Sequence, residues 1–237
     1  MSTDITKDQK TPKGIWPRND TSKVKITQDA TGKKTYTVHG DLVLDKDYSF
    51  YDGNLVVEGK IFSEKGTTFS LCVLGSIFVE YEIDIGGRLN ATNITAMNID
   101  ARRISADENI NVRRDIDSKE EIYAGENIYA GGNIYAGGNI TARNINAWNI
   151  STNGNIDATE NITTKGCIRA RNINAWNIYA IENIKVGNVK AGFILCETLE
   201  QEKGSLLTAQ LLIEHRSKLP LKVIPRDGNR YDYWSTR

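Results

Sequence analysis

An aliphatic residue recurs every five or six positions through the middle of the chain. From Glu121 the sequence reads EIYAGEN, IYAGGN, IYAGGN, ITARN, INAWN, ISTNGN, IDATEN, ITTKGC, IRARN, INAWN, IYAIEN and IKVGN. Two positions after the aliphatic residue there is usually an alanine, and the residue between them is mostly polar. Strand side chains alternate between the two sides of the backbone, so each unit is predicted to be a three-residue strand, apolar inward and polar outward.

The residues between these short strands are typical of tight corners. Asn precedes the Ile in nearly every unit, and Asn tolerates left-handed dihedrals and can bond nearby backbone groups. Glycine pairs stand at 131–132 and 137–138, where we expect them to supply the unusual dihedrals of a corner. Asparagines at successive corners would also stack into ladders of hydrogen bonds.

The spacing excludes the common alternatives to a coil. Isoleucines five and six residues apart do not stay on one face of a helix, and no longer alternating strands are joined by two-residue turns. Units this short bury their apolar side only by stacking on neighbouring coils. The sequence therefore predicts an all-β chain, a single-stranded, three-sided β-helix (β-solenoid) of five- and six-residue rungs. The mixed spacing favours a right-handed coil.

The repeat divides the chain into four parts. Residues 1–22 are expected to form a flexible N-terminal arm, 23–40 a hairpin cap, 41–200 the solenoid of about nine coils, and 201–237 a C-terminal cap or tail. Within the last part, residues 205–216 are compatible with an amphipathic helix or with a further strand. One segment, 142–150, recurs unchanged at 170–178, and the shift between the two copies is not a whole number of coils.

Charge and cysteine usage narrow the classes of function. The 30 Lys+Arg balance the 30 Asp+Glu, so no basic excess indicates a nucleic-acid partner. No apolar run is long enough for a transmembrane segment, and the N-terminus has no secretory h-region. We expect a cytoplasmic protein; leaderless export or a place in a virion stays open. Three scattered cysteines, Cys72, Cys167 and Cys196, predict no disulfide framework, metal site or cofactor.

No residue pattern indicates catalysis. An acyltransferase of the hexapeptide-repeat kind needs a histidine beside the coil, but His39 and His215 both lie outside the regular repeat. Charged residues at corners and outward positions are expected to form a solvated exterior: Glu126, Glu160, Glu182, Asp157, Arg169 and Lys185. Convergence of carboxylates across coils stays open, since stacking brings distant residues together.

Aromatic residues outside the predicted core form the candidate interaction surface: Tyr123, Tyr129, Tyr135, Trp148, Trp176, Tyr179 and Trp234. With three rungs per coil, the first three tyrosines are expected on three different faces. The tryptophans stand at corners, where they either contact a partner or a sugar, or pack against the neighbouring corner.

Two copies of the motif Ala-Gly-Gly-Asn-Ile, at 130–134 and 136–140, resemble the repeats of polymer-forming, bactofilin-like β-solenoid proteins. The resemblance covers roughly residues 41–200 and implies a cytoplasmic, cytoskeleton-like scaffold that assembles end to end through its core coils. This chain departs from that pattern by its Ile and Asn residues, where those proteins favour Val and Gly, and by terminal segments that would block the ends. No functional residue is carried over.

The architecture indicates a non-enzymatic structural, scaffold or interaction protein, whose partner is a second copy of the chain, as a homo-oligomer or filament, or another protein. The alternative is a carbohydrate-binding or carbohydrate-cleaving β-helix module, of the phage or surface type. A third hypothesis is an inhibitor that mimics a partner's surface.

Overall fold

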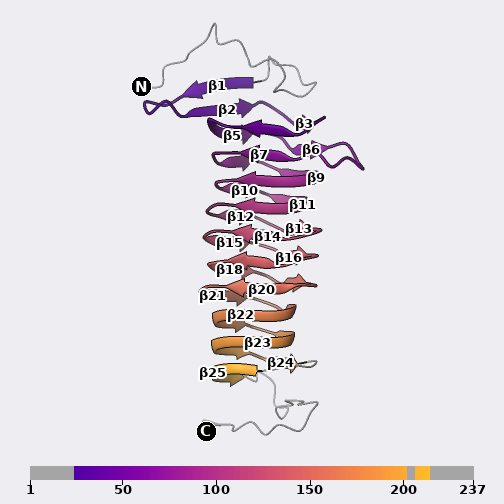
Figure 1. Cartoon of the computed structure of the whole chain (residues 1–237), viewed down its shortest axis with the longest axis vertical. Coiled ribbons are helices and arrows are strands. Elements are labelled where there is room, and N and C mark those ends of the chain that lie inside the picture. Colours follow the sequence, from indigo (N-terminus) through magenta and orange to yellow (C-terminus); the bar gives the residue numbers. More distant parts are fainter. Residues whose placement is uncertain (1–23, 202–205, 214–237) are drawn as a thin grey trace.

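The described part of the chain is built from strands alone. The structure is a computed structural model that describes residues 24–201 and 206–213. Figure 1 shows the strands stacked as one column, with β1 at one end and β25 at the other. The stack has about 10 turns of parallel strands, which confirms the β-solenoid. No helix forms among these residues, and so none that is long and apolar enough to cross a membrane.

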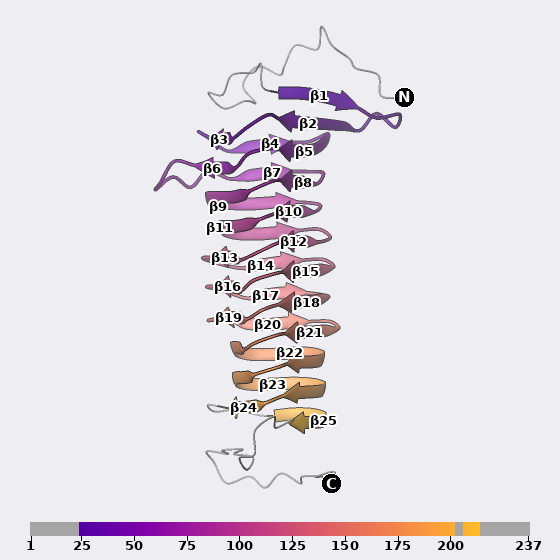
Figure 2. The same cartoon turned by 180° about the vertical axis from the view of Figure 1, so that it is seen from behind.

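Three flat faces run along the column, and each is a ladder of strands from successive coils (Figure 2). Face A contains β2 (Lys34–Val38), β5 (Gly53–Val57), β8 (Ile77–Val79), β10 (Ile94–Ala96), β12 (Ile110–Val112), β15 (Asn127–Ala130), β18 (Asn144–Ala147), β21 (Asn161–Thr164) and the last parts of β22 (Ile168–Ala180), β23 (Asn183–Cys196) and β25 (Leu206–Ile213). Face B contains β3 (Leu42–Leu44), β6 (Ile61–Ser63), the first parts of β9 (Glu82–Ala91) and β11 (Asn98–Ala106), β13 (Ile116–Ser118), β16 (Ile134–Ala136), β19 (Ile150–Thr152), the first parts of β22 and β23, and β24 (Thr198–Gln201). Face C contains β4 (Tyr48–Phe50), β7 (Leu71–Val73), the last parts of β9 and β11, β14 (Ile122–Ala124), β17 (Ile140–Ala142), β20 (Asn155–Ala158), the middle of β22 and β23, and the first part of β25.

Each rung buries its first and third residues and exposes the one between them. In β14 Ile122 and Ala124 are both 1% exposed, whereas Tyr123 is 44% exposed. The parallel register places like residues on one another, so Ile122 pairs with Ile140, and Ile140 with Ile156. The inside and outside assignment made from the sequence is confirmed, and the core is a column of isoleucines lined by alanines.

The ends of the described stack differ from its middle. β1 (Val24–Gln28) pairs antiparallel with β2, and β2 also pairs parallel with β5, so it belongs both to the hairpin and to face A. The first coils are longer than the later ones: Tyr48 pairs with Leu71, whereas Ile128 pairs with Ile145. At the other end residues 206–213 form a strand, β25, rather than a helix. The predicted N-terminal arm lies outside the described residues, as does most of the predicted C-terminal segment.

The two identical copies of the segment 142–150 lie on different faces. Ile145 of the first copy is on face A, and Ile173 of the second is on face C. The shift between the copies corresponds to five rungs, whereas two coils require six. The same sequence therefore forms the same rung-and-corner geometry on different faces, which shows that the faces are built by one local rule.

The glycine pairs act by size and not by dihedral angle. Among the described glycines, positive φ is found at Gly32, Gly40 and Gly66, which lie before or within the longer early coils. The expectation of unusual dihedrals at 131–132 and 137–138 is therefore wrong. A Cβ on Gly131 would overlap the carbonyl oxygen of Arg113, because successive corners stack backbone on backbone. Glycine fits there because it lets the two backbones approach closely.

Asparagines form hydrogen-bonded ladders along the corners. At the corner that leads into face A, each asparagine after the first donates from Nδ2 to Oδ1 of the asparagine one coil earlier, over 2.8–3.2 Å; this ladder contains Asn93, Asn109, Asn127, Asn144, Asn161 and Asn177. Shorter ladders lead into face B (Asn133 and Asn149) and into face C (Asn155, Asn172 and Asn188). The predicted ladders are confirmed, and their bonds join successive coils instead of a residue to its own backbone.

A charge placed in the core tests the assignment of inside and outside. Ile134 is fully buried and Tyr135 is 44% exposed. We expect Ile134→Asp to lower the free energy of unfolding by about 4 kcal/mol or more, because the interior offers the carboxylate no partner. Tyr135→Ser, at the neighbouring exposed position, is the control and should change the free energy of unfolding by less than about 1 kcal/mol. Equal losses of thermal stability in the two variants would contradict the assignment.

The asparagine ladder gives a second prediction. Oδ1 of Asn144 accepts hydrogen bonds from N and Nδ2 of Asn161, at 3.0 and 2.9 Å. In Asn144→Ala these part-buried donors lose their acceptor, so we expect about 2 kcal/mol less stability in urea unfolding. Asn174→Ala removes an exposed outward asparagine of face C and should be neutral within about 0.5 kcal/mol. If both variants unfold alike, the ladder does not stabilise the stack.

Candidate interaction surface

The three predicted surface tyrosines belong to one coil. Tyr123 lies on face C, Tyr129 on face A and Tyr135 on face B, and each is 44% exposed. The expected separation is confirmed: these side chains point away from the column in three directions. They cannot act together on one small ligand.

The other described members of the predicted surface lie on or beside face A. Tyr179 is on face A and is 38% exposed. Trp176 stands at a corner that leads into face A and is 71% exposed, and Trp148, on an earlier coil, stands at a corner that leaves face A and is 51% exposed. The ring of Tyr179 lies 5.4 Å from that of Phe193 on the next coil. Nζ of Lys165 lies 5.6 Å from the ring centroid of Trp148, so this corner packs against its neighbour while it also stays exposed. Trp234 lies outside the described residues.

Five exposed apolar residues of the same region were missed by the sequence interpretation. Tyr51, Leu74, Phe78 and Tyr81 are 72%, 61%, 45% and 45% exposed, and Ile181 is 52% exposed. Phe78 is the outward residue of β8, and the others stand at corners beside face A. The sequence signal for each of them was a large apolar residue at a position that is polar in most units. For the residues between 51 and 81 the less regular early coils concealed this signal, whereas Ile181 stands in the regular repeat and could have been found there.

Nine of the eleven large hydrophobic residues that are exposed in the described part of the chain lie on face A or on its two flanking corners. They are Tyr51, Leu74, Phe78, Tyr81, Tyr129, Trp148, Trp176, Tyr179 and Ile181. Exposed apolar residues gathered on one side of a protein mark an interaction surface.

Face B has a different chemical character. Asp84, Asp100 and Asp117 stack at its outward positions in three successive coils. Partial desolvation, and then the charges of Asp117 and Asp84, raise the pKa of Asp100. Farther along, Arg169 and Lys185 stack in the same column. The column thus changes from acidic residues to basic ones along the stack, and it ends on Glu200, which pairs with Lys185.

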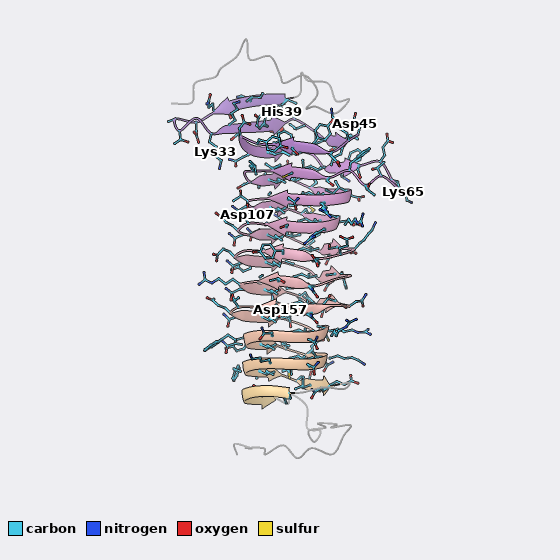
Figure 3. All side chains as sticks on the ribbon, in the orientation of Figure 1. Lys33, His39, Asp45, Lys65, Asp107 and Asp157 are labelled. Atoms are coloured by element: carbon cyan, nitrogen blue, oxygen red, sulfur yellow. The ribbon has the colours of Figure 1, made fainter. Side chains whose placement is uncertain are left out.

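Most carboxylates singled out in the sequence are engaged at corners. Glu126 and Glu160 lie on either side of Arg143, whose guanidinium contacts them at 3.0 and 2.7 Å. Glu182 accepts a hydrogen bond from the Cys167 thiol at 3.1 Å. Asp157 stacks between Thr141 and Asn174, away from other acids, on the outside of the column (Figure 3). These three glutamates and Asp157 do not form a shared carboxylate site.

In the described part of the chain, His39 and the cysteines show no catalytic arrangement; His215 lies outside the described residues. Nδ1 of His39 lies 2.8 Å from Oε2 of Glu58 at an exposed corner. Desolvation is the largest cause that raises the pKa of the Cys167 thiol, and its backbone N–H bonds to Asn149, so it fills an asparagine position of the ladder. Within the described ranges, no group of three or more His, Cys, Asp and Glu side chains is placed to hold a metal ion.

The aspartate row predicts a dependence of stability on pH. Because the pKa of Asp100 is raised in the folded state, the native protein binds this proton more tightly than the unfolded chain does. The stabilisation of the folded state that comes from this tighter proton binding is complete below the pKa of about 3.9 in the unfolded chain. It is lost as the pH rises through the pKa of Asp100 in the folded state. We expect Asp100→Asn to be more stable than the parent at pH 7, with a difference that disappears toward pH 3.

Urea unfolding at several pH values measures this effect. Asp157→Asn is the matched control, because Asp157 has no acidic neighbour in its column. If the free energies of unfolding of Asp100→Asn and the parent differ by the same amount from pH 3 to pH 7, repulsion among the aspartates of the row is excluded.

Comparisons with protein-family models, with curated proteins and with solved structures found no match for this chain. The resemblance to polymer-forming solenoids therefore remains one of repeat sequence.

Proposed function

We propose that the chain is a non-enzymatic structural protein, whose rigid β-solenoid serves self-association first and the binding of another protein second. The observation that carries this proposal is the unbroken ladder of parallel rungs on three flat faces. A parallel stack with a continuous core resists bending, since each coil is bonded to its neighbours along all three faces. The cytoplasmic location expected from the sequence is part of this proposal.

The distribution of polar groups supports a scaffold over an enzyme. Corner charges are used in ion pairs between successive coils, such as Arg102 with Glu120 at 2.7 Å and Arg103 with Glu121 at 2.6 Å. Such pairs favour the correct stacking of coils, because a coil slipped by one layer would lose them. The exposed apolar residues, in contrast, gather beside one face, as expected of a surface that meets another protein.

The aspartate row favours a second candidate, a carbohydrate-binding or carbohydrate-cleaving module. Asp84, Asp100 and Asp117 lie in adjacent layers, and the layer spacing of about 4.8 Å is close to the separation of about 5 Å between the carboxyl groups of retaining glycosidases. An acid with a raised pKa beside ionised neighbours suits general acid catalysis. Polysaccharide cleavage that is lost in Asp100→Asn, with the fold intact, would support this candidate.

Measurement of the assembly state tests the first proposal. Light scattering after size exclusion, over a hundredfold range of concentration, is expected to give dimers or larger species. Negative-stain images should show straight particles about 50 Å long, from about ten layers at 4.8 Å each, that are thicker than a single column. A monomer at every concentration would contradict self-association.

A further inference from the structure

Face A carries no charged residue at its outward positions from β2 to β23. The register connects one outward residue per strand: Thr37, Val56, Phe78, Thr95, Asn111, Tyr129, Asn146, Thr163, Tyr179 and Leu195. Face B in contrast carries Asp, Arg, Lys and Glu in the corresponding column. Face A is thus the neutral side of a chain that is one quarter charged.

The order of residues along this column is symmetric about Tyr129. One strand away on either side stands an asparagine, Asn111 or Asn146. Two strands away stands a threonine, Thr95 or Thr163.

The symmetry continues farther from the centre. Three strands from Tyr129 stands an aromatic residue, Phe78 or Tyr179, and four strands away an aliphatic one, Val56 or Leu195. The column therefore reads nearly the same from either end.

The flanking corners follow the same symmetry. On the coil of Phe78, the corners carry Leu74 before the face and Tyr81 after it, so three exposed apolar residues span the face. On the coil of Tyr179, the corners carry Trp176 before the face and Ile181 after it. The two apolar triplets lie at equal numbers of layers from Tyr129, as successive corner hydrogen bonds show.

A two-fold axis along the strand direction, through the layer of Tyr129, would turn one copy of the chain face to face onto another with the rods antiparallel. In such an isologous contact, residue i meets residue j and residue j meets residue i. Tyr129 then meets Tyr129 of the second copy, and Phe78 meets Tyr179. At the corners Leu74 meets Trp176, and Tyr81 meets Ile181.

The charges at the corner before face A give one like-charge and one opposite-charge approach. Glu126 lies in the layer of the axis and would approach Glu126 of the second copy, and each is paired with its own Arg143 at 3.0 Å. At the corner before face A, Glu108 and Arg143 lie one layer on either side of the layer of Glu126. The same rotation brings Glu108 of one copy toward Arg143 of the other. On the opposite corner the central layer holds Gly131 and Gly132, so no charged side chain stands there.

We infer that face A is the surface through which two copies of this chain associate, antiparallel and with the two-fold axis at Tyr129. This inference rests on the proposed self-association and specifies its geometry. The eleven strands of face A make it about 50 Å long. Three residues at about 3.3 Å each, with the flanking corners, make it about 15 Å wide, which gives roughly 750 Å² per copy, near the 800 Å² of standard interfaces. A symmetric sequence of side chains is what a second copy recognises, whereas an unrelated partner or a glycan gives no reason for it.

The three tyrosines of the central coil supply the test with its own controls. Tyr129→Arg places two cations at the two-fold axis, and we expect it to raise the dissociation constant of the dimer at least about tenfold. Tyr123→Arg and Tyr135→Arg change the same residue type at equal exposure on faces C and B, and should leave the constant unchanged. All three variants should retain the circular dichroism and thermal stability of the parent.

Cross-linking tests the direction of the two rods. The double variant Phe78→Cys/Tyr179→Cys should give a dimer under mild oxidation, with a disulfide that joins position 78 of one copy to position 179 of the other. Within one chain these positions lie six layers apart, about 29 Å, which is too far for a disulfide. Phe78→Cys alone should give no more disulfide-linked dimer than the parent chain gives through its native cysteines. A disulfide between position 78 of both copies would indicate parallel rods and overturn the geometry.

The outcomes separate this inference from the function on which it rests. A monomeric parent chain overturns both. A parent dimer that survives Tyr129→Arg and gives no 78-to-179 link overturns face A but leaves self-association in place. A dimer weakened by Tyr135→Arg or Asp100→Lys instead would assign the contact to face B.

Discussion

The structure depends on one constraint: every rung must stack in register on the rung one coil before it. Backbone hydrogen bonds between parallel strands hold the three faces, and asparagine amides bond corner to corner. A three-residue strand is too short to be stable alone, so its hydrogen bonds and its buried isoleucine are available only within the stack. The ladders matter because they satisfy polar groups at part-buried corners, where an unpaired amide would be costly.

This constraint explains which residues the chain uses and where. Isoleucine on isoleucine fills the interior of a narrow column, and alanine keeps the third residue of the rung small. Glycine stands where one corner backbone would otherwise collide with the next, as at Gly131 and Gly137. Three of the inward positions that would hold alanine hold Ser118, Thr152 and Thr164, whose hydroxyls bond to nearby corner carbonyls, so their burial leaves no unpaired group.

Because the interior is nearly uniform, the outward residues distinguish one face from another. Face A is neutral, with apolar groups at its flanks, and face B carries a row of three acids followed, farther along, by two bases and a glutamate. Each column combines residues that lie one coil apart in the sequence. A surface of this kind supports the proposal of a protein that meets other proteins along its length, and its symmetry supports the proposal that the partner is a second copy of the chain.

The sequence alone determined the repeat, the inward isoleucines, the corner asparagines and the placement of Tyr123, Tyr129 and Tyr135 on separate faces, because each follows from a local period and the alternation of a strand. Only the tertiary structure decided the role of the glycines, the row of Asp84, Asp100 and Asp117, and the symmetric column of face A. The coils differ in length, since Arg88 pairs with Arg103 but Tyr48 pairs with Leu71. The partner of a given residue in the next coil therefore cannot be counted along the chain, and it is known only when the strands are stacked.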